Sequence, residues 1–287
     1  MKKAGKILRR LYWAVTMLFL ALSVSVATYA WFTSNHTVDT NTATARSGTE
    51  SVTLEISEQG GNAFAPVEEA VIQQVNQTNT ESLLPVSTSD LQNFVFNAHT
   101  VNGTAKSFQR VENERYYYHG RLYLRANAQG LPEGTRLALY LDSSREAGGD
   151  MVSTDSGELL DAARLGLVFD NAAQNSTIFR LRDAYNSSGN TSNTMLNGVT
   201  LQDQSVLSWN GSGVTPVADP SITLGQRTIQ MEGTRVTLAE QPLLTMNLNQ
   251  IYQLDIYFYI EGCDPDCAEN VYYDAANLHL GFYGIVE

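Results

Sequence analysis

The chain has little basic charge, only two cysteines and only one long uncharged apolar stretch. Its 18 Lys and Arg are outnumbered by 30 Asp and Glu, so the formal net charge of the 287 residues is −12. Nucleic-acid binding needs clustered basic charge, which this balance argues against. One apolar stretch excludes a channel or transporter with several membrane spans. A hydrophobic fraction of 43% in turn excludes wholesale disorder.

Sequence motifs for common catalytic chemistry are also absent. The chain contains no His-Glu-x-x-His, no Gly-x-Ser-x-Gly and no Gly-x-x-x-x-Gly-Lys-Ser/Thr. The sequence therefore gives no indication of a helical zinc-protease site, a nucleophile elbow or a phosphate-binding loop. The histidines are scattered singly along the chain, at His36, His99, His119 and His279. These absences predict that the protein is not an enzyme.

The one uncharged apolar stretch, Leu11 to Phe32, lies at the N-terminus. At 1.5 Å per residue it is long enough to span a bilayer about 30 Å thick. A basic start, an apolar middle and small residues near the end are also typical of a signal peptide, here cleaved between Ala30 and Trp31 or after Ala27. If the segment is retained, it anchors the protein to the membrane with the acidic bulk outside. Both readings place the chain after about residue 31 outside the cytoplasm.

The two cysteines enclose the tripeptide Asp264-Pro265-Asp266. Proline favours a turn that would bring Cys263 and Cys267 together, and an exported protein meets an oxidising compartment. A local disulfide is therefore predicted, with two free thiols or half of a metal site as alternatives.

The acidic residues of the same segment raise the question of a bound cation. Oxygen ligands from Asp264, Asp266 and Glu269 would suit Ca²⁺, but the full EF-hand spacing is missing and the sequence favours a solvated acidic turn. We therefore expect no cofactor.

Alternation of apolar and polar residues predicts many short strands. The clearest cover residues 51–57, where Val52, Leu54 and Ile56 share a face, and the C-terminal segments 252–260 and 277–284. The segments 115–127 and 136–142 flank a turn at 132–134 and are predicted to pair as a hairpin. Short helices are expected only at 156–163 and 67–74.

Together these patterns predict an all-β fold, a jelly-roll-like antiparallel β-sandwich with long loops and one or two short helices, preceded by the N-terminal hydrophobic helix. The expected organisation is a signal peptide or anchor at 1–30, an extended polar lead at 31–50 and a β-sandwich domain at 51–287. A tyrosine cluster formed by Tyr116, Tyr117, Tyr118 and Tyr123 is either a platform for glycans or a partner, or a ladder that fills the sheet.

Both ends of the chain resemble one family. The stretch Thr28-Tyr29-Ala30-Trp31-Phe32-Thr33-Ser34-Asn35, followed by Asn41-Thr42-Ala43 and Ser47-Gly48-Thr49, resembles the SipW-type signal region of TasA/camelysin-like proteins. The ending Glu261-Gly262-Cys263-Asp264-Pro265-Asp266-Cys267 is similar to that of uncharacterised surface proteins of Gram-positive bacteria. The resemblance covers about 40 residues. It implies a jelly-roll protein exported through a dedicated signal peptidase to the cell envelope, in some members as a biofilm-matrix fibre subunit.

Two functional hypotheses follow. The first is a secreted or cell-surface structural protein, a homo-oligomer or fibre subunit that assembles by adding an N-terminal strand to a neighbour's sheet edge, with Val52, Leu54 and Ile56 setting the register. The alternative to strand donation is that residues 51–57 pair within their own sheet and the protein is a monomer. The second hypothesis is a surface-anchored module that binds glycans through tyrosine faces. Partners expected besides further copies are the signal peptidase and, with the segment retained, the membrane.

Overall fold

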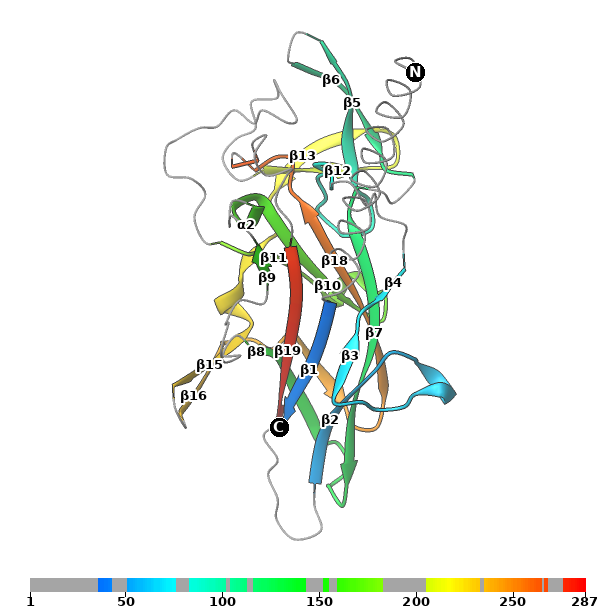
Figure 1. The fold of residues 1–287 in the computed structure, drawn as a ribbon, viewed down its shortest axis with the longest axis vertical. Helices are drawn as coiled ribbons and strands as arrows, with labels where there is room; N and C mark the ends of the chain where they lie inside the picture. The colour runs from blue at the N-terminus through cyan, green and yellow to red at the C-terminus, as the bar shows by residue number, and fades with distance from the viewer. Residues whose placement is uncertain are drawn as a thin grey trace, which may run out of the picture. The chain divides into compact units, whose positions relative to one another are not determined.

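Two large β-sheets pack face to face around the main hydrophobic core (Figure 1). The computed structural model describes residues 36–42, 51–75, 83–101, 104–112, 116–142, 152–154, 159–182, 205–232, 235–264, 266–267 and 276–287. The predicted signal segment, its cleavage position at Ala30 and Trp31, the N-terminal helix and Glu269 lie outside these residues. Of the helices in the described ranges, none has the length and apolarity needed to cross a bilayer.

The first sheet has eight strands and contains both the first and the last strand of the described chain. Its main path runs β16 (Arg235–Leu238), β15 (Thr228–Glu232), β8 (Arg136–Asp142), β19 (Ala276–Val286), β1 (His36–Thr42) and β3 (Glu69–Val71). Two further strands join it: β17 (Leu244–Asn247) pairs with β8, and β9 (Val152–Thr154) pairs with β19.

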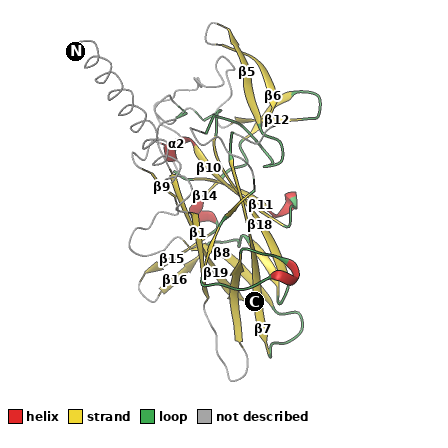
Figure 2. Cartoon of the chain, turned by 45° about the vertical axis from the view of Figure 1, so that its right-hand side comes forward, coloured by secondary structure: helices red, strands yellow, loops and turns green. Residues whose placement is uncertain are grey.

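The second sheet has seven strands. Its main path runs β14 (Ile222–Thr223), β11 (Ser176–Arg180), β10 (Ala163–Phe169), β18 (Ile251–Ile260), β7 (Tyr118–Gln129) and β2 (Ser51–Ser57), and β4 (Gln73–Gln74) pairs with β7. Two separate hairpins, β5–β6 (Val95–Val101, Thr104–Arg110) and β12–β13 (Ser205–Trp209, Val214–Ala218), complete the strands. Figure 2 shows β5, β6 and β12 at the end of the sandwich away from the C-terminal end of β7. The helical parts are short: α2 (Leu159–Ala162), η1 (Gly61–Ala63), η2 (Ala173–Asn175) and η3 (Leu224–Gln226).

The period-two pattern explains why the sheets face each other. Leu122 and Leu124 of β7 and Leu254 and Ile256 of β18 are fully buried on the inner face of the seven-stranded sheet. The opposing layer comes from the eight-stranded sheet, with Leu137, Leu139, Leu141, Leu280 and Phe282. The predicted all-β sandwich is confirmed, and the predicted helix at 156–163 is confirmed in its central part, Leu159–Ala162.

Two local predictions were wrong. Residues 118–129 and 136–142 do not pair as a hairpin, because β7 and β8 belong to different sheets and the turn between them crosses the sandwich. Both segments bury an apolar face in the same core, but from opposite sides. Residues 67–74 form no helix; they contain β3 and β4, with Ala70 and Ile72 buried.

The outer face of the seven-stranded sheet carries a second cluster under residues 86–96. Tyr117 stacks on Phe94 with ring centroids 3.9 Å apart, and Tyr259 meets the same ring edge-on at 5.3 Å. Leu91, in a left-handed conformation with φ of 58°, covers Gly166 so closely that an added Cβ would lie 2.5 Å from its Cδ2. Tyr117 in this cluster and Tyr118 in the main core are therefore packing residues, which agrees with the sheet-filling interpretation of the tyrosine cluster.

Candidate functional site

The most unusual element of the sandwich is β1, which lies in the stretch expected to be an extended lead. It runs parallel to β19 over its whole length, from His36 opposite Leu278 to Thr42 opposite Gly284. Its other side pairs antiparallel with β3, with Val38 opposite Ala70. Figure 1 shows β1 lying directly beside β19, next to the C-terminus. The first described strand therefore fills a slot between the last strand and the edge strand β3.

The sequence of β1 suits a strand held mainly through its backbone. The heptapeptide His-Thr-Val-Asp-Thr-Asn-Thr contains a single aliphatic residue, Val38. One valine side chain can contribute at most about 1.5–3 kcal/mol of hydrophobic stabilisation, even if it is fully buried. On β19, by contrast, Leu278, Leu280 and Phe282 are buried in the main core. With one aliphatic residue in seven, we expect main-chain hydrogen bonds to supply most of the stabilisation that holds β1, as in strand addition to a sheet edge.

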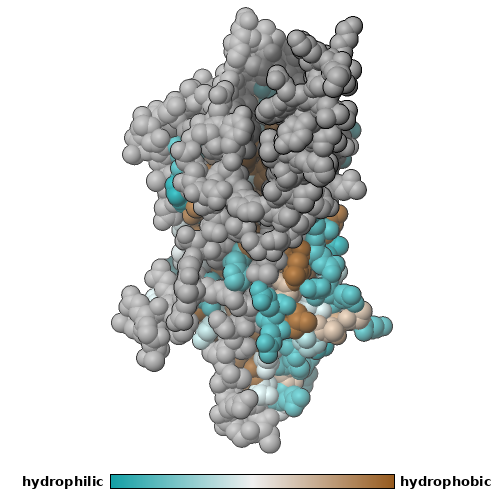
Figure 3. Space-filling view, in the orientation of Figure 1, coloured by the Kyte–Doolittle hydropathy of each residue, from teal (hydrophilic) through white to brown (hydrophobic). Residues whose placement is uncertain are grey.

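The strand β3 on the other side of the slot belongs to an exposed edge segment. Val67, Val71 and Val75 are 44%, 53% and 46% exposed, while Ala70 between them is buried. Figure 3 shows apolar patches among hydrophilic atoms on the face that carries β3 and β4. The slot is thus bordered by apolar surface in a chain whose net charge is strongly negative.

The predicted donor, β2, is a member of its own chain's sheet. It pairs antiparallel with β7 from Ser51 opposite Gln129 to Ser57 opposite Tyr123. Val52, Leu54 and Ile56 are 3%, 2% and 0% exposed and lie in the main core. This is the arrangement given above as the alternative to strand donation. Withdrawing three core side chains would cost far more than withdrawing β1.

The end of the slot adjoins a turn and a surface cavity. Thr42 lies opposite Gly284, two residues before Val286, which pairs with Leu137 at the start of β8. The β7–β8 turn, residues 130–135, connects this point to Gln129, the partner of Ser51. We call this end of the sandwich the turn end.

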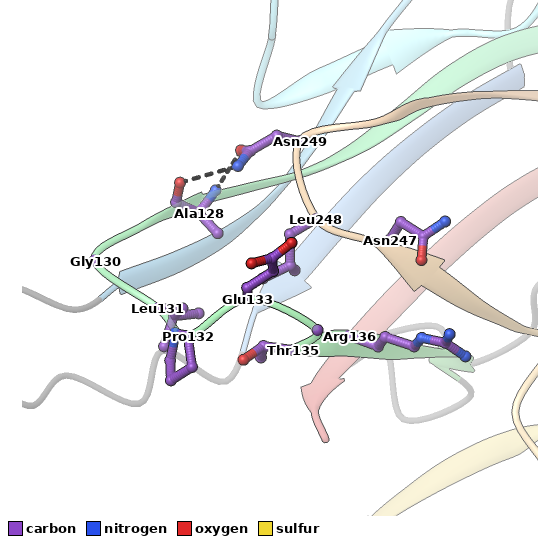
Figure 4. A pocket seen from close by; sticks show the side chains of 11 residues that line it. Ala128, Gly130, Leu131, Pro132, Glu133, Thr135, Arg136, Asn247, Leu248 and Asn249 are labelled. Carbon is purple, nitrogen blue, oxygen red and sulfur yellow. Dashed lines mark hydrogen bonds between the residues drawn. The ribbon is translucent and has the colours of Figure 1, made fainter.

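The cavity at the turn end measures about 470 Å³. It lies between residues 130–136 and residues 247–249 (Figure 4). Asn249, at φ 62°, fixes its upper rim by accepting from the Ala128 N–H at 2.9 Å and donating to the Ala128 carbonyl at 3.3 Å. Glu133 and Arg136 are both exposed, and Figure 4 shows the guanidinium of Arg136 extending away from Glu133.

A buried charge cluster lies at the C-terminal end of β18. Arg164 donates from Nη2 to Asp264 at 2.6 Å and approaches Asp219 at 3.5 Å. Glu261 accepts from the N–H of Cys263 at 3.0 Å. Burial acts to lower the pKa of Arg164, but Asp264, Asp219 and Glu261 outweigh it and hold that pKa above its ordinary value. Burial raises the pKa of Glu261 to about 8, although Arg164 opposes the shift.

The predicted cysteine pair is present as two buried thiols. Cys263 packs with Val95 and Leu207 beside the two hairpins, and its Sγ lies 3.4 Å from the Ser87 hydroxyl. Cys267 belongs to the main core instead. Burial raises the pKa of both thiols. The disulfide stays a prediction, and the structure places the two side chains in different clusters.

The acidic residues around the cysteines do not meet as a ligand set in the described part of the chain. The Asp264 carboxylate is engaged by Arg164 and by the N–H of Asp266 at 2.9 Å. Within the described ranges, no three potential metal-ligating side chains come together. A Ca²⁺ site that includes Glu269 is not tested by these contacts.

A second polar network on the outer face of β7 and β18 was not foreseen. Asp255 accepts from Nε2 of His119 at 2.9 Å, from Nε of Arg121 at 2.8 Å and from Nε2 of Gln253 at 2.6 Å. Burial alone would raise the pKa of Asp255, but these three donors lower it overall. His119 also stacks on Tyr257 at 4.4 Å. The only signal in the sequence was polar residues alternating along both strands, which also fits a solvated face.

Comparison with family models, curated proteins and solved structures gives no match.

Proposed function

We propose that this protein is a structural protein of the cell surface or extracellular matrix whose subunits associate by exchanging the strand β1. The observation that carries the proposal is the slot: an N-terminal strand with one aliphatic residue lies between β19 and β3. Emptying the slot would leave the backbone groups of both neighbours unpaired. A sheet edge of that kind accepts a strand from the same chain or from another copy with the same hydrogen bonds.

Export is the second part of the proposal. Its support is the basic start, the apolar stretch and the small residues around Ala30. The resemblance of both chain ends to TasA/camelysin-like proteins agrees with an envelope of a Gram-positive bacterium and with a role in a biofilm matrix. N-terminal sequencing of the exported protein tests this part: a start at Trp31 supports a released subunit, whereas an intact Met1 converts the proposal to a membrane-anchored subunit.

The exchanged strand differs from the one expected from the sequence. Val52, Leu54 and Ile56 of β2 are core residues, whereas β1 precedes β2 and has little apolar surface to lose. Exchange of an identical element costs little, because each contact broken within a chain is remade between chains.

A cross-linking experiment tests the exchange. Asn41 lies opposite Tyr283 in the β1–β19 register. Two differently tagged chains, one with Asn41→Cys and the other with Tyr283→Cys, are co-expressed and oxidised. Exchange predicts a cross-link between the two tags, and each variant expressed alone serves as the control for the native thiols. If no cross-link joins the two tags and the protein sediments as a monomer at every concentration, the proposal is contradicted.

A further inference from the structure

The two ends of the segment that joins β1 to β2 lie at the same end of the sandwich. Thr42 leaves the slot beside Gly284, and Ser51 enters the second sheet opposite Gln129. Val286 and Glu287 pair with the start of β8, and the β7–β8 turn joins that point to Gln129. Residues 42 and 51 are therefore both at the turn end.

Chain length limits how far apart two exchanging copies can lie. Nine residue steps lead from 42 to 51, and an extended chain covers about 3.3 Å per step, so the link reaches at most about 30 Å. When one copy lends β1, its own turn end must lie within that distance of the turn end of the recipient. Stacking copies end to end repeats each turn end after at least one strand length. With 12 residues in β7, that length is about 40 Å.

From this geometry, and resting on the proposed function, we infer that β1 is exchanged reciprocally between two copies whose turn ends face each other. Facing turn ends place each slot within reach of the other copy's strand, so both exchanges are made at once. The same surface then serves both copies, which is the isologous contact of a two-fold dimer. The unit of assembly is a closed pair, and a longer array needs a second contact elsewhere, such as the opposite end of the sandwich, which carries the β5–β6 hairpin (Figure 2).

The surface of the turn end suits a second copy. Glu133 and Arg136 are exposed, of opposite charge and separated by two residues on the turn. Across a two-fold axis, Glu133 of one copy can pair with Arg136 of the other, and the reverse pair forms at the same time. The cavity of about 470 Å³ beside them gives the turn of the partner a concave surface to enter.

Charge reversal in the exported full chain tests the inference. Glu133→Arg and Arg136→Glu each place like charges across the axis, and each is expected to weaken the dimer by about tenfold. The double variant restores opposite charges and is expected to recover the affinity. Glu240→Arg, at an exposed position outside the turn end, is the matched control and should change little. Sedimentation should give a particle of twice the mass of the exported chain that does not grow with concentration.

The possible failures are distinguishable. If the tagged chains with Asn41→Cys and Tyr283→Cys do not cross-link, exchange itself is refuted and the proposed function fails. If they cross-link but sediment as particles that grow with concentration, exchange stands and reciprocal pairing is refuted. A closed dimer that neither single charge reversal weakens would remove the turn end as its interface.

Discussion

The Arg164 guanidinium donates to the Asp264 carboxylate at 2.6 Å, and both side chains are almost completely buried, at 2% and 3% exposed. The two residues lie 100 positions apart, on β10 and on the turn after β18. Asp219, from the segment after β13, joins them at 3.5 Å. One cation thus connects three segments, and Asp219 and Glu261 compete with Asp264 for it.

Removing this cation is expected to destabilise the fold. Arg164→Met fills a similar volume but removes the positive charge beside Asp264 and Asp219. Breaking a buried ion pair on one side costs about 3–5 kcal/mol of unfolding free energy. The pair between Arg182 and Asp161, 2.7 Å apart with side chains 46% and 34% exposed, supplies the control. Arg182→Ala should cost less than about 1 kcal/mol in the same urea titration. Equal losses for the two variants would contradict the role of Arg164.

Glu261 is expected to make the unfolding free energy depend on pH. Burial raises its pKa from an ordinary 4.5 to about 8 in the folded protein. The charged and titratable groups around it are Arg164, Asp219, Tyr259, Cys263 and Cys267. Because the folded state holds this proton to higher pH than the unfolded chain, the contribution is fully present below about pH 4.5. It is then lost as the pH rises through about 8.

Between pH 6 and pH 8.5 the unfolding free energy should therefore fall by about 2–3 kcal/mol. Glu261→Gln removes the titration and should flatten the pH profile over this interval. Glu240→Gln, at an exposed position, should leave the wild-type slope unchanged. A slope that survives in Glu261→Gln would assign the pH dependence to another group.

Regular alternation allowed the sheets to be predicted, but not their connection. The patterns around Leu254 and Leu280 have a single interpretation, because aliphatic residues or phenylalanine fall at alternate positions from 254 to 260 and from 278 to 282. The turn at Pro132 and Gly134 has the same chemistry whether the strands on either side pair or cross between sheets. Its residues therefore could not exclude the hairpin.

The strand β1 and the Arg164 cluster were harder to predict from the sequence than the two sheets. β1 has one aliphatic residue, so no hydrophobic periodicity marks it as a strand. Its place in the sheet depends on β19, more than 200 residues later. Arg164 interrupts an apolar strand, but nothing near it in the sequence indicates Asp219 or Asp264. Residues 67–74 have apolar residues at positions 67, 70 and 71, which is also a helical spacing.

The cysteines provide a chemical test of the turn after β18. Because both thiols are buried with raised pKa values, Cys263 and Cys267 should resist alkylation in the native protein and react once it is unfolded. Three samples are alkylated and analysed by mass spectrometry: the native protein, the unfolded protein, and the protein unfolded under reducing conditions. The comparison distinguishes buried free thiols from a disulfide. Modification only after reduction would instead establish the disulfide predicted from the sequence. Modification of both thiols in the native protein would contradict their burial.

The last prediction concerns the occupant of the slot. A chain that begins at Ser51 lacks β1 and exposes the backbone edge of β19 beside Leu278, Leu280 and Phe282. The lost ladder should lower the unfolding free energy by about 3–6 kcal/mol, at roughly 0.5–1.5 kcal/mol for each hydrogen bond. A synthetic peptide of residues 33–44 should bind this chain and restore its thermal midpoint, because the slot recognises a strand through its backbone and register.

A peptide of the same composition with its order scrambled is the matched control for that experiment. It keeps the backbone donors but moves the aliphatic side chain of Val38 out of register with Leu280. It should therefore bind more weakly. Nuclear magnetic resonance of a peptide labelled at Val38 would report the parallel register directly. A shortened chain as stable as the complete one, with no response to either peptide, would show that β1 is dispensable and that the slot takes no part in assembly.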